Sequence, residues 1–108
     1  MQLGEAKRLL KKIKEIKYSK HAEIRCEQRN IDKKLIEGHI SSPENLVKVV
    51  QQPALKGEIK LKLYFDVSNE RTLIIVTLLK EESLYIITSV IRIRKWQEGI
   101  EKWYRKHL

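Results

Sequence analysis

The chain has 108 residues, 42% of them hydrophobic, which fits one folded domain with its own core rather than a disordered chain. No apolar run is long enough to span a bilayer, the charged start predicts no secretion signal, and the single cysteine, Cys26, excludes an internal disulfide, so we expect a cytoplasmic protein. The formal net charge is +9, and the excess lies at the two ends: residues 1–20 hold seven bases and two acids, and residues 92–108 hold six bases and two acids.

The first part of the chain has helical periodicity. A basic amphipathic helix is predicted within residues 1–17. Its apolar residues recur at helical spacing and are Leu3, Ala6, Leu9, Leu10, Ile13 and Ile16. Two further helices are predicted within residues 18–42, with Ser19 as the N-cap of one and Asp32 as the N-cap of the other. The segment SSPE then ends the helical part, because proline disfavours a helix before it.

A change of period at Asn45 predicts a sheet over residues 45–94. Its four strands are NLVKVVQQ, EIKLKLYFDV, TLIIVTLL and LYIITSVIRIR. The third strand shows no alternation, so we expect it to be central and covered on both faces. Tight turns predict an antiparallel meander. A last helix, at residues 95–108, completes an α+β fold with N-terminal helices packed on a four-stranded antiparallel sheet and a C-terminal helix.

The helix after Ser19 carries an alignment of basic side chains. His21, Arg25 and Arg29 are spaced four residues apart, so on a helix they lie within about 80° of one face. An imidazole beside two guanidinium groups is suited to binding an anion and transferring a proton. An ordinary solvated helix surface is the alternative.

The same stretch, HAEIRCEQRNI, fits the pattern His-Ala-x-x-Arg-x-x-x-Arg-x-Ile, and a second helix ending near Pro-Glu and an antiparallel sheet follow it. In these features residues 18–94 resemble a widespread family of small prokaryotic domains that is placed beside the RelE/ParE superfamily of toxins, close to the BrnT type. The resemblance implies an α+β fold whose sheet face cleaves or grips RNA. It also implies an antitoxin partner that neutralises the basic surface. It assigns no catalytic residue position by position.

Cleavage of RNA without a metal needs a proton acceptor, cations for the phosphorane and a proton donor. His21 is the strongest candidate proton carrier, because the ordinary pKa of a histidine, about 6.5, lies near neutrality. Arg25 and Arg92 complete the predicted catalytic set. The predicted nucleic-acid-binding residues are Arg29, Lys60, Lys62, Tyr64, Arg94 and Tyr104. If the polar side of the second strand faces solvent, its lysines and tyrosine share one surface with the arginines of the fourth strand.

Each of these residues also has a structural interpretation. His21 is suited to a hydrogen bond with the backbone or a neighbouring strand, and the two helix arginines are suited to pairing with carboxylates such as Glu37. Lys60 and Lys62 fit the solvated side of an amphipathic strand. Cys26 fits a small buried residue.

The predicted function is therefore that of a toxin-like component of a toxin–antitoxin pair, a metal-independent endoribonuclease that acts on mRNA, free or on the ribosome. A non-catalytic module of the same fold that binds nucleic acid or protein is the alternative. A homodimer through Trp96 and Trp103 is a third interpretation. We expect no metal or cofactor, because Cys26 and the three scattered histidines have no ligand spacing and no glycine-rich nucleotide turn is present.

Overall fold

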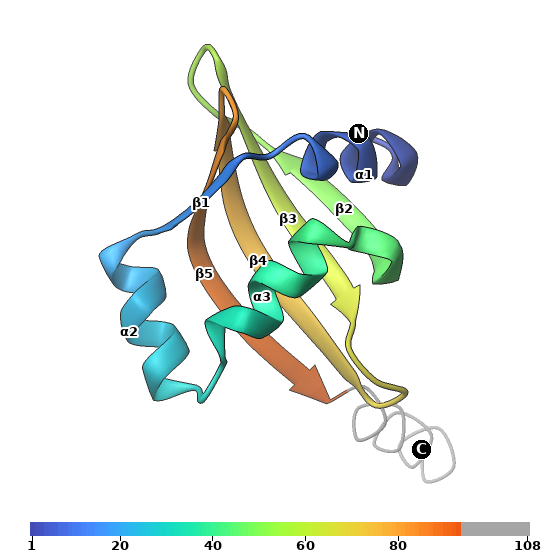
Figure 1. The fold of residues 1–108 in the computed structure, drawn as a ribbon, viewed down its shortest axis with the longest axis vertical. Coiled ribbons are helices and arrows are strands. Elements are labelled where there is room, and N and C mark those ends of the chain that lie inside the picture. Colours follow the sequence, from blue (N-terminus) through green and yellow to red (C-terminus); the bar gives the residue numbers. More distant parts are fainter. Residues whose placement is uncertain (94–108) are drawn as a thin grey trace, which may run out of the picture.

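A five-stranded sheet with three helices on one face makes up the part of the chain that the computed structural model describes, residues 1–93 (Figure 1). The helices are α1 (Leu3–Lys11), α2 (Lys20–Gln28) and α3 (Lys33–Ser41), followed by a 3-10 turn, η1 (Pro43–Asn45). The strands are β1 (Glu15–Tyr18), β2 (Leu46–Gln52), β3 (Glu58–Asp66), β4 (Arg71–Lys80) and β5 (Ser83–Ile93). None of α1 to α3 is long and apolar enough to cross a membrane.

The strand order is β1-β5-β4-β3-β2, and the predicted sheet of four antiparallel strands is wrong. Strands β2 to β5 do form an antiparallel meander, but β1 adds a fifth strand that is parallel to β5 and pairs Glu15 with Ser83 and Tyr18 with Ile86. The sheet is therefore mixed. The predicted C-terminal helix at residues 95–108 lies outside the described residues.

The strand β1 also corrects the long first helix predicted within residues 1–17, since α1 ends at Lys11. From Glu15 to Tyr18 the side chains alternate between exposed and half-buried, which is the period of a strand. Ile16 satisfies both patterns, because it lies three residues after Ile13 and two residues before Tyr18. The segment forms a strand rather than a helix because the edge of β5 is available for pairing, and this pairing gives its backbone N–H and C=O groups hydrogen-bond partners.

The two predicted helix starts are confirmed. The Ser19 hydroxyl accepts a hydrogen bond from the Ala22 backbone N–H at 3.0 Å, and the Asp32 carboxylate accepts one from the Lys34 backbone N–H at 2.9 Å. Between these helices Asn30 adopts a φ of 53°, a left-handed conformation that asparagine tolerates well and that stops α2.

The core lies between the helices and one face of the sheet. Each helix contributes to a single buried cluster, and its helical members include Ala6 and Leu10 of α1, Ala22 and Cys26 of α2, and Ile36 and Ile40 of α3. The alternating residues of β3 and β4 that meet them include Leu61, Leu63, Phe65, Leu73 and Ile75. The helices thus cover one sheet face, here called the covered face (Figure 1).

No described helix lies on the opposite face of the sheet. The strand β4 is central, as expected. The described helices pack on one of its faces, and on the other face its side chains from Thr72 to Leu78 are buried or half-buried. On the uncovered side Ile74 is 5% exposed, whereas Val76 and Leu78 are half-buried.

Candidate nucleic-acid interface

The uncovered side of the sheet, called the open face below, brings together side chains from all five strands. Directly paired residues point to the same side of a sheet, so the register defines its members. Lys62 pairs with Val76, and Val76 pairs with Thr88, whereas the sequence neighbours of Lys62 lie in the core. By this rule the open face consists of Glu15, Lys17, Lys48, Val50, Gln52, Glu58, Lys60, Lys62, Tyr64, Asp66, Thr72, Ile74, Val76, Leu78, Lys80, Ser83, Tyr85, Thr88, Val90 and Arg92.

The centre of the open face is apolar. Ile74, Val76 and Leu78 follow one another along β4, and Val90 lies beside Ile74 on β5. These positions are the reason that TLIIVTLL shows no alternation: one set of apolar residues fills the core and the other fills the middle of the open face. Ile74 is buried, whereas Val76, Leu78 and Val90 are half-buried, so this apolar centre is partly accessible. A partly accessible apolar area with a polar rim is a feature of surfaces that bind a ligand.

Two tyrosines flank this centre, and lysines contact both. The ammonium groups of Lys48 and Lys62 lie 5.3 and 5.6 Å from the centroid of the Tyr64 ring. The ammonium group of Lys17 lies 5.5 Å from the centroid of the Tyr85 ring. These distances are within the range of cation–π attraction. Each tyrosine therefore places a flat aromatic ring next to at least one lysine ammonium group on the open face.

The lysines around Tyr64 have no carboxylate partner within the described chain. Among residues 1–93, no ion pair involves Lys48, Lys60 or Lys62. The acids of the open face lie at strand ends: Glu15 begins β1, and Glu58 and Asp66 are the first and last residues of β3. The part of the open face formed by β2 and β3 is thus cationic, and no described ion pair cancels the field of its three ammonium groups. Lys17 of β1, at the other edge of the sheet, pairs with Glu15 at 3.6 Å.

Four of the residues predicted to bind or cleave RNA lie on the open face. Lys60, Lys62 and Tyr64 line its β3 row, and Arg92 lies on β5 near the end of the described chain, in the same cross-strand row as Thr72 and Asp66. Arg94 and Tyr104 lie outside the described residues, as do Trp96 and Trp103, which were predicted to form a dimer contact.

The predicted proton carrier lies on a different layer. His21 is exposed on α2, the helix that packs against the covered face. The Nε–H group of Arg25 donates to Nε2 of His21 at 3.4 Å, and another N–H of Arg25 donates to the Gln28 side chain at 3.3 Å. Within the described residues, no hydrogen bond joins His21 or Arg25 to the open face. The structure therefore does not bring these two residues together with Arg92.

Arg29 lies at the end of α2 and contacts the sheet. One of its Nη groups donates to the Ser89 carbonyl oxygen at 2.6 Å, on the part of β5 that β1 does not pair with. The neighbouring Cys26 is 4% exposed, and its sulfur lies 3.4 Å from the Ser89 hydroxyl, which confirms its interpretation as a buried residue. These contacts hold α2 against the edge of β5.

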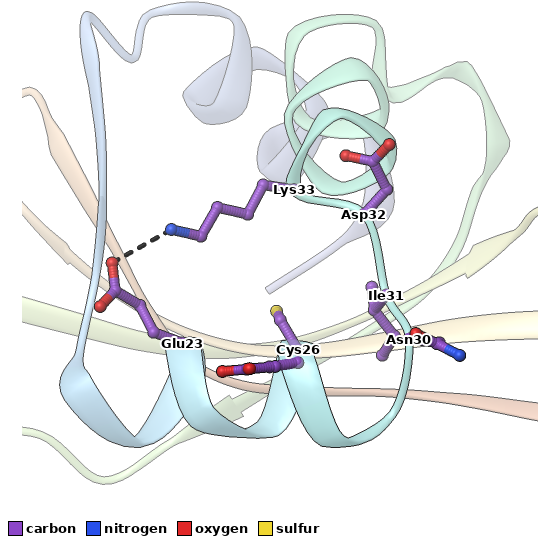
Figure 2. A pocket seen from close by; sticks show the side chains of 7 residues that line it. Glu23, Cys26, Asn30, Ile31, Asp32 and Lys33 are labelled. Carbon is purple, nitrogen blue, oxygen red and sulfur yellow. Dashed lines mark hydrogen bonds and ion pairs between the residues drawn. The ribbon is translucent and has the colours of Figure 1, made fainter.

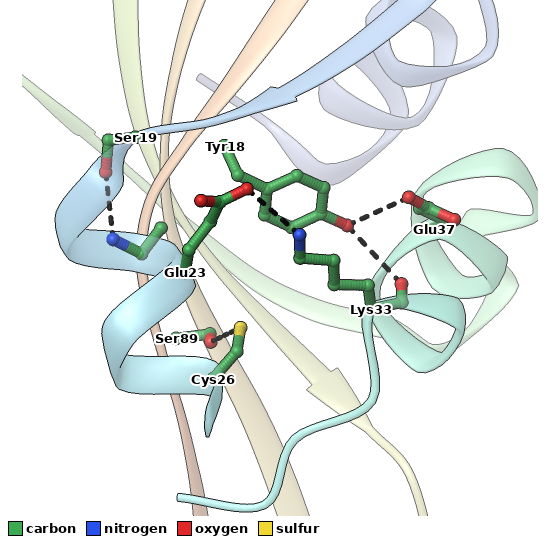
Figure 3. A network of polar contacts seen from close by, with 8 residues as sticks. Tyr18, Ser19, Glu23, Cys26, Lys33, Glu37 and Ser89 are labelled. Carbon is green, nitrogen blue, oxygen red and sulfur yellow. Dashed lines mark hydrogen bonds and ion pairs between the residues drawn. The ribbon is translucent and has the colours of Figure 1, made fainter. Parts of the chain in front are cut away.

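A polar network joins β1, α2 and α3 on the helical side (Figure 3). The Tyr18 hydroxyl donates to the Glu37 carboxylate at 3.1 Å, so Glu37 pairs with this tyrosine rather than with an arginine of α2. Lys33 lies over the Tyr18 ring and pairs with Glu23 at 3.1 Å. Burial, and then the charge of Glu37, raise the pKa of Tyr18 above its ordinary value, which keeps the phenol neutral.

A hollow of about 660 Å³ lies beside this network, between α2 and the start of α3 (Figure 2). Its lining includes three carboxylates, from Glu23, Glu27 and Asp32, and one lysine, Lys33, which already pairs with Glu23. An acidic hollow repels a polyanion, so it is a poor site for RNA. Among residues 1–93, no group of three or more His, Cys, Asp and Glu side chains is placed to hold a metal ion.

The sequence did not identify Lys17, Lys48 and Tyr85 as residues of the candidate RNA-binding surface. Lys17 was assigned to a helix, so its place on the sheet became visible only with β1. Tyr85 was not singled out, because the register shift in the pairing of β4 with β5, between Val76 and Thr77, interrupts the alternation of β5. Lys48 is the one lysine of β2, and its period-two relation to Val50 was the signal that could have identified it.

Comparison of the chain with protein families, with curated proteins and with solved structures found no match. The open face and the α2 residues are therefore interpreted from their own geometry and charge.

Proposed function

We propose that the protein binds single-stranded RNA on its open face. The observation that supports this proposal most directly is the cluster of Lys48, Lys60 and Lys62 around Tyr64, on a sheet face that carries no helix among residues 1–93. Ammonium groups without carboxylate partners complement phosphates. An aromatic ring and an apolar centre suit the faces of unpaired bases.

A single strand fits this surface better than a duplex. In a duplex the base faces are stacked inside, and only charge at the backbone would be available to the lysines. The accessible parts of Val76 and Leu78 on β4 would then remain in contact with water or phosphate. Unpaired bases can cover this row while the phosphates reach the lysine side chains. The same chemistry suits RNA in the cytoplasm, the compartment expected from the lone cysteine.

Binding without cleavage is the form of the function that the geometry favours. The predicted endoribonuclease needs a proton carrier beside the phosphate, and His21 lies on α2 without a described contact to the open face. The proposal includes the toxin role and the antitoxin partner that the resemblance implies. In that role, an acidic antitoxin would bind the open face and compete with RNA.

Binding to a fluorescent single-stranded RNA at several salt concentrations tests the proposal. We expect the logarithm of the affinity to fall linearly with the logarithm of the salt concentration, with a slope of about −0.7 per phosphate contact. Lys62→Gln should lower the affinity about 3- to 10-fold at low salt and make the slope less steep by up to about 0.7. The matched control is Lys34→Gln, since Lys34 is exposed on α3, and it should leave both quantities unchanged.

Equal effects of the two lysine substitutions would contradict an RNA site on the open face, and so would a failure to bind RNA at all. The same samples, incubated with RNA in EDTA, test the catalytic alternative. Cleavage that His21→Ala and Arg92→Ala abolish without loss of folding would establish the endoribonuclease. Binding without product supports the binding module.

A further inference from the structure

We infer that Tyr64 and Tyr85 are two separate stacking sites for one RNA strand, which crosses the sheet obliquely between them. This inference rests on the proposed function and adds the path of the RNA. The two rings are the tyrosines that the described chain places on the open face, and each has a lysine ammonium group within 5.6 Å of its centroid.

The register gives the separation of the two rings. Tyr64 of β3 pairs with Ile74 of β4, and Tyr85 of β5 pairs with Leu78 of β4. The tyrosines are thus displaced by four residues along the strands and by two strands across the sheet. With about 3.4 Å per residue and about 4.8 Å per strand, their Cα atoms lie about 17 Å apart.

This separation excludes stacking of neighbouring bases on the two rings. Successive nucleotides of a stacked strand rise by about 3.4 Å along the helix axis, so bases on two rings about 17 Å apart cannot be neighbours, and further nucleotides lie between them. The surface between the rings includes the half-buried side chains of Val76 and Leu78, which can contact the faces of the intervening bases. A segment of at least about four unpaired nucleotides meets these requirements.

The lysines complete each stacking site. In the free protein, Lys48 and Lys62 contact the Tyr64 ring, whereas Lys17 contacts the Tyr85 ring and also pairs with Glu15 at 3.6 Å. A base that stacks on a ring displaces an ammonium group from its face, and the long lysine side chain then reaches the adjacent phosphate. Each anchored nucleotide is held through both its base and its backbone.

Oligouridines of two, four and eight nucleotides, measured against variants of the full chain, test this path. Tyr64→Leu and Tyr85→Leu should each lower the affinity for the eight-nucleotide RNA about 5- to 100-fold, because each removes one stacking site. Tyr64→Phe and Tyr85→Phe keep the rings and should bind like the unsubstituted protein. The dinucleotide cannot reach both rings, so either leucine variant should affect its affinity less than that of the longer RNA.

The outcomes separate this inference from the function on which it rests. If Lys62→Gln weakens binding but both leucine variants bind normally, RNA binds the open face without stacking on these tyrosines, and the inference is overturned. Equal losses for the dinucleotide and the eight-nucleotide RNA would also overturn the shared path. If the unsubstituted protein binds none of the three RNAs, the proposed function itself is contradicted. Thermal unfolding of each variant confirms that it is folded.

Discussion

Tyr18 shows how one side chain links three parts of the fold. It is the last residue of β1, its hydroxyl donates to Glu37 of α3, and Lys33 lies over its ring and pairs with Glu23 of α2 (Figure 3). Burial and the nearby carboxylate oppose ionisation of the phenol. A neutral tyrosine is therefore part of the folded state, and its protonation is linked to stability.

The stability contributed by Tyr18 should depend on pH in a defined direction. Because its pKa is raised on folding, the unfolded chain releases this proton first, so the contribution is complete below about pH 10 and falls as the pH rises above that value. Tyr18→Phe should lower the free energy of unfolding by about 1 kcal/mol at pH 7, because it loses one hydrogen bond. The gap between the two proteins should narrow above about pH 10 in urea unfolding.

Tyr85→Phe is the control at pH 7, where it should change the free energy of unfolding by less than about 0.5 kcal/mol. A gap that stays constant from neutral to alkaline pH would contradict the link between folding and the Tyr18 proton.

Sequence reasoning at the residue scale worked where the chemistry is local. Ser19 and Asp32 were predicted as N-caps, because a hydroxyl or a carboxylate before a helix has a partner only two or three residues away. The partners of Arg29 and Glu37 were not predictable in this way. Arg29 contacts Ser89, which is 60 residues distant, and that contact exists only once α2 has docked on β5.

At the scale of elements, the strands β2 to β5 were predictable and β1 was not. The strands of the meander are long, rich in β-branched residues and separated by tight turns. β1 has four residues, and Ile16 fits the helical repeat of the preceding segment as well as the strand alternation. Its assignment depends on a free edge of β5, and the position of that edge is a property of the finished sheet. The lysine of β1 was lost from the predicted site for the same reason.

The docking of α2 on β5 provides a test that separates the two arginines of the helix motif. Arg29→Ala should lower the free energy of unfolding by about 1–2 kcal/mol, because it leaves the Ser89 carbonyl without its charged donor. Arg25→Ala is the matched control and should change the free energy of unfolding by less than about 0.5 kcal/mol, since the side-chain hydrogen bonds of Arg25 among the described residues go to His21 and Gln28 on its own helix. Urea unfolding measures both values. An equal, small effect of the two substitutions would show that Arg29 has no structural role.

At the scale of the whole molecule, the described charges are unevenly distributed. The hollow beside α2 has acidic walls, whereas the open face and α1 are rich in cations, among them Arg8, Lys11 and Lys12, which are exposed. The net charge of +9 belongs to a chain of only 108 residues. Repulsion among these cations opposes the compact state, and dissolved salt screens it.

Added salt should therefore stabilise the protein. An increase from about 0.02 to about 0.3 M NaCl shortens the Debye length to less than about 10 Å and should raise the melting temperature by a few degrees. The double variant Lys34→Glu, Lys56→Glu lowers the net charge by four at two exposed positions outside the open face. It should show a smaller rise. Thermal unfolding at both salt concentrations measures the change in melting temperature for each protein. A melting temperature that falls with added salt would contradict repulsion among the cations.

The pairing of β1 with β5 also bears on how the chain reaches its native state. Glu15 and Ser83 are neighbours across the sheet although 68 residues separate them. During synthesis β1 cannot pair until β5 has been made, because β5 provides the edge on which β1 docks. Closing so large a loop is entropically costly, and non-local pairings of this kind slow folding. Until β5 emerges, β1 has no strand to pair with, whereas the elements that α1 contacts, among them α3 and β2, are already present.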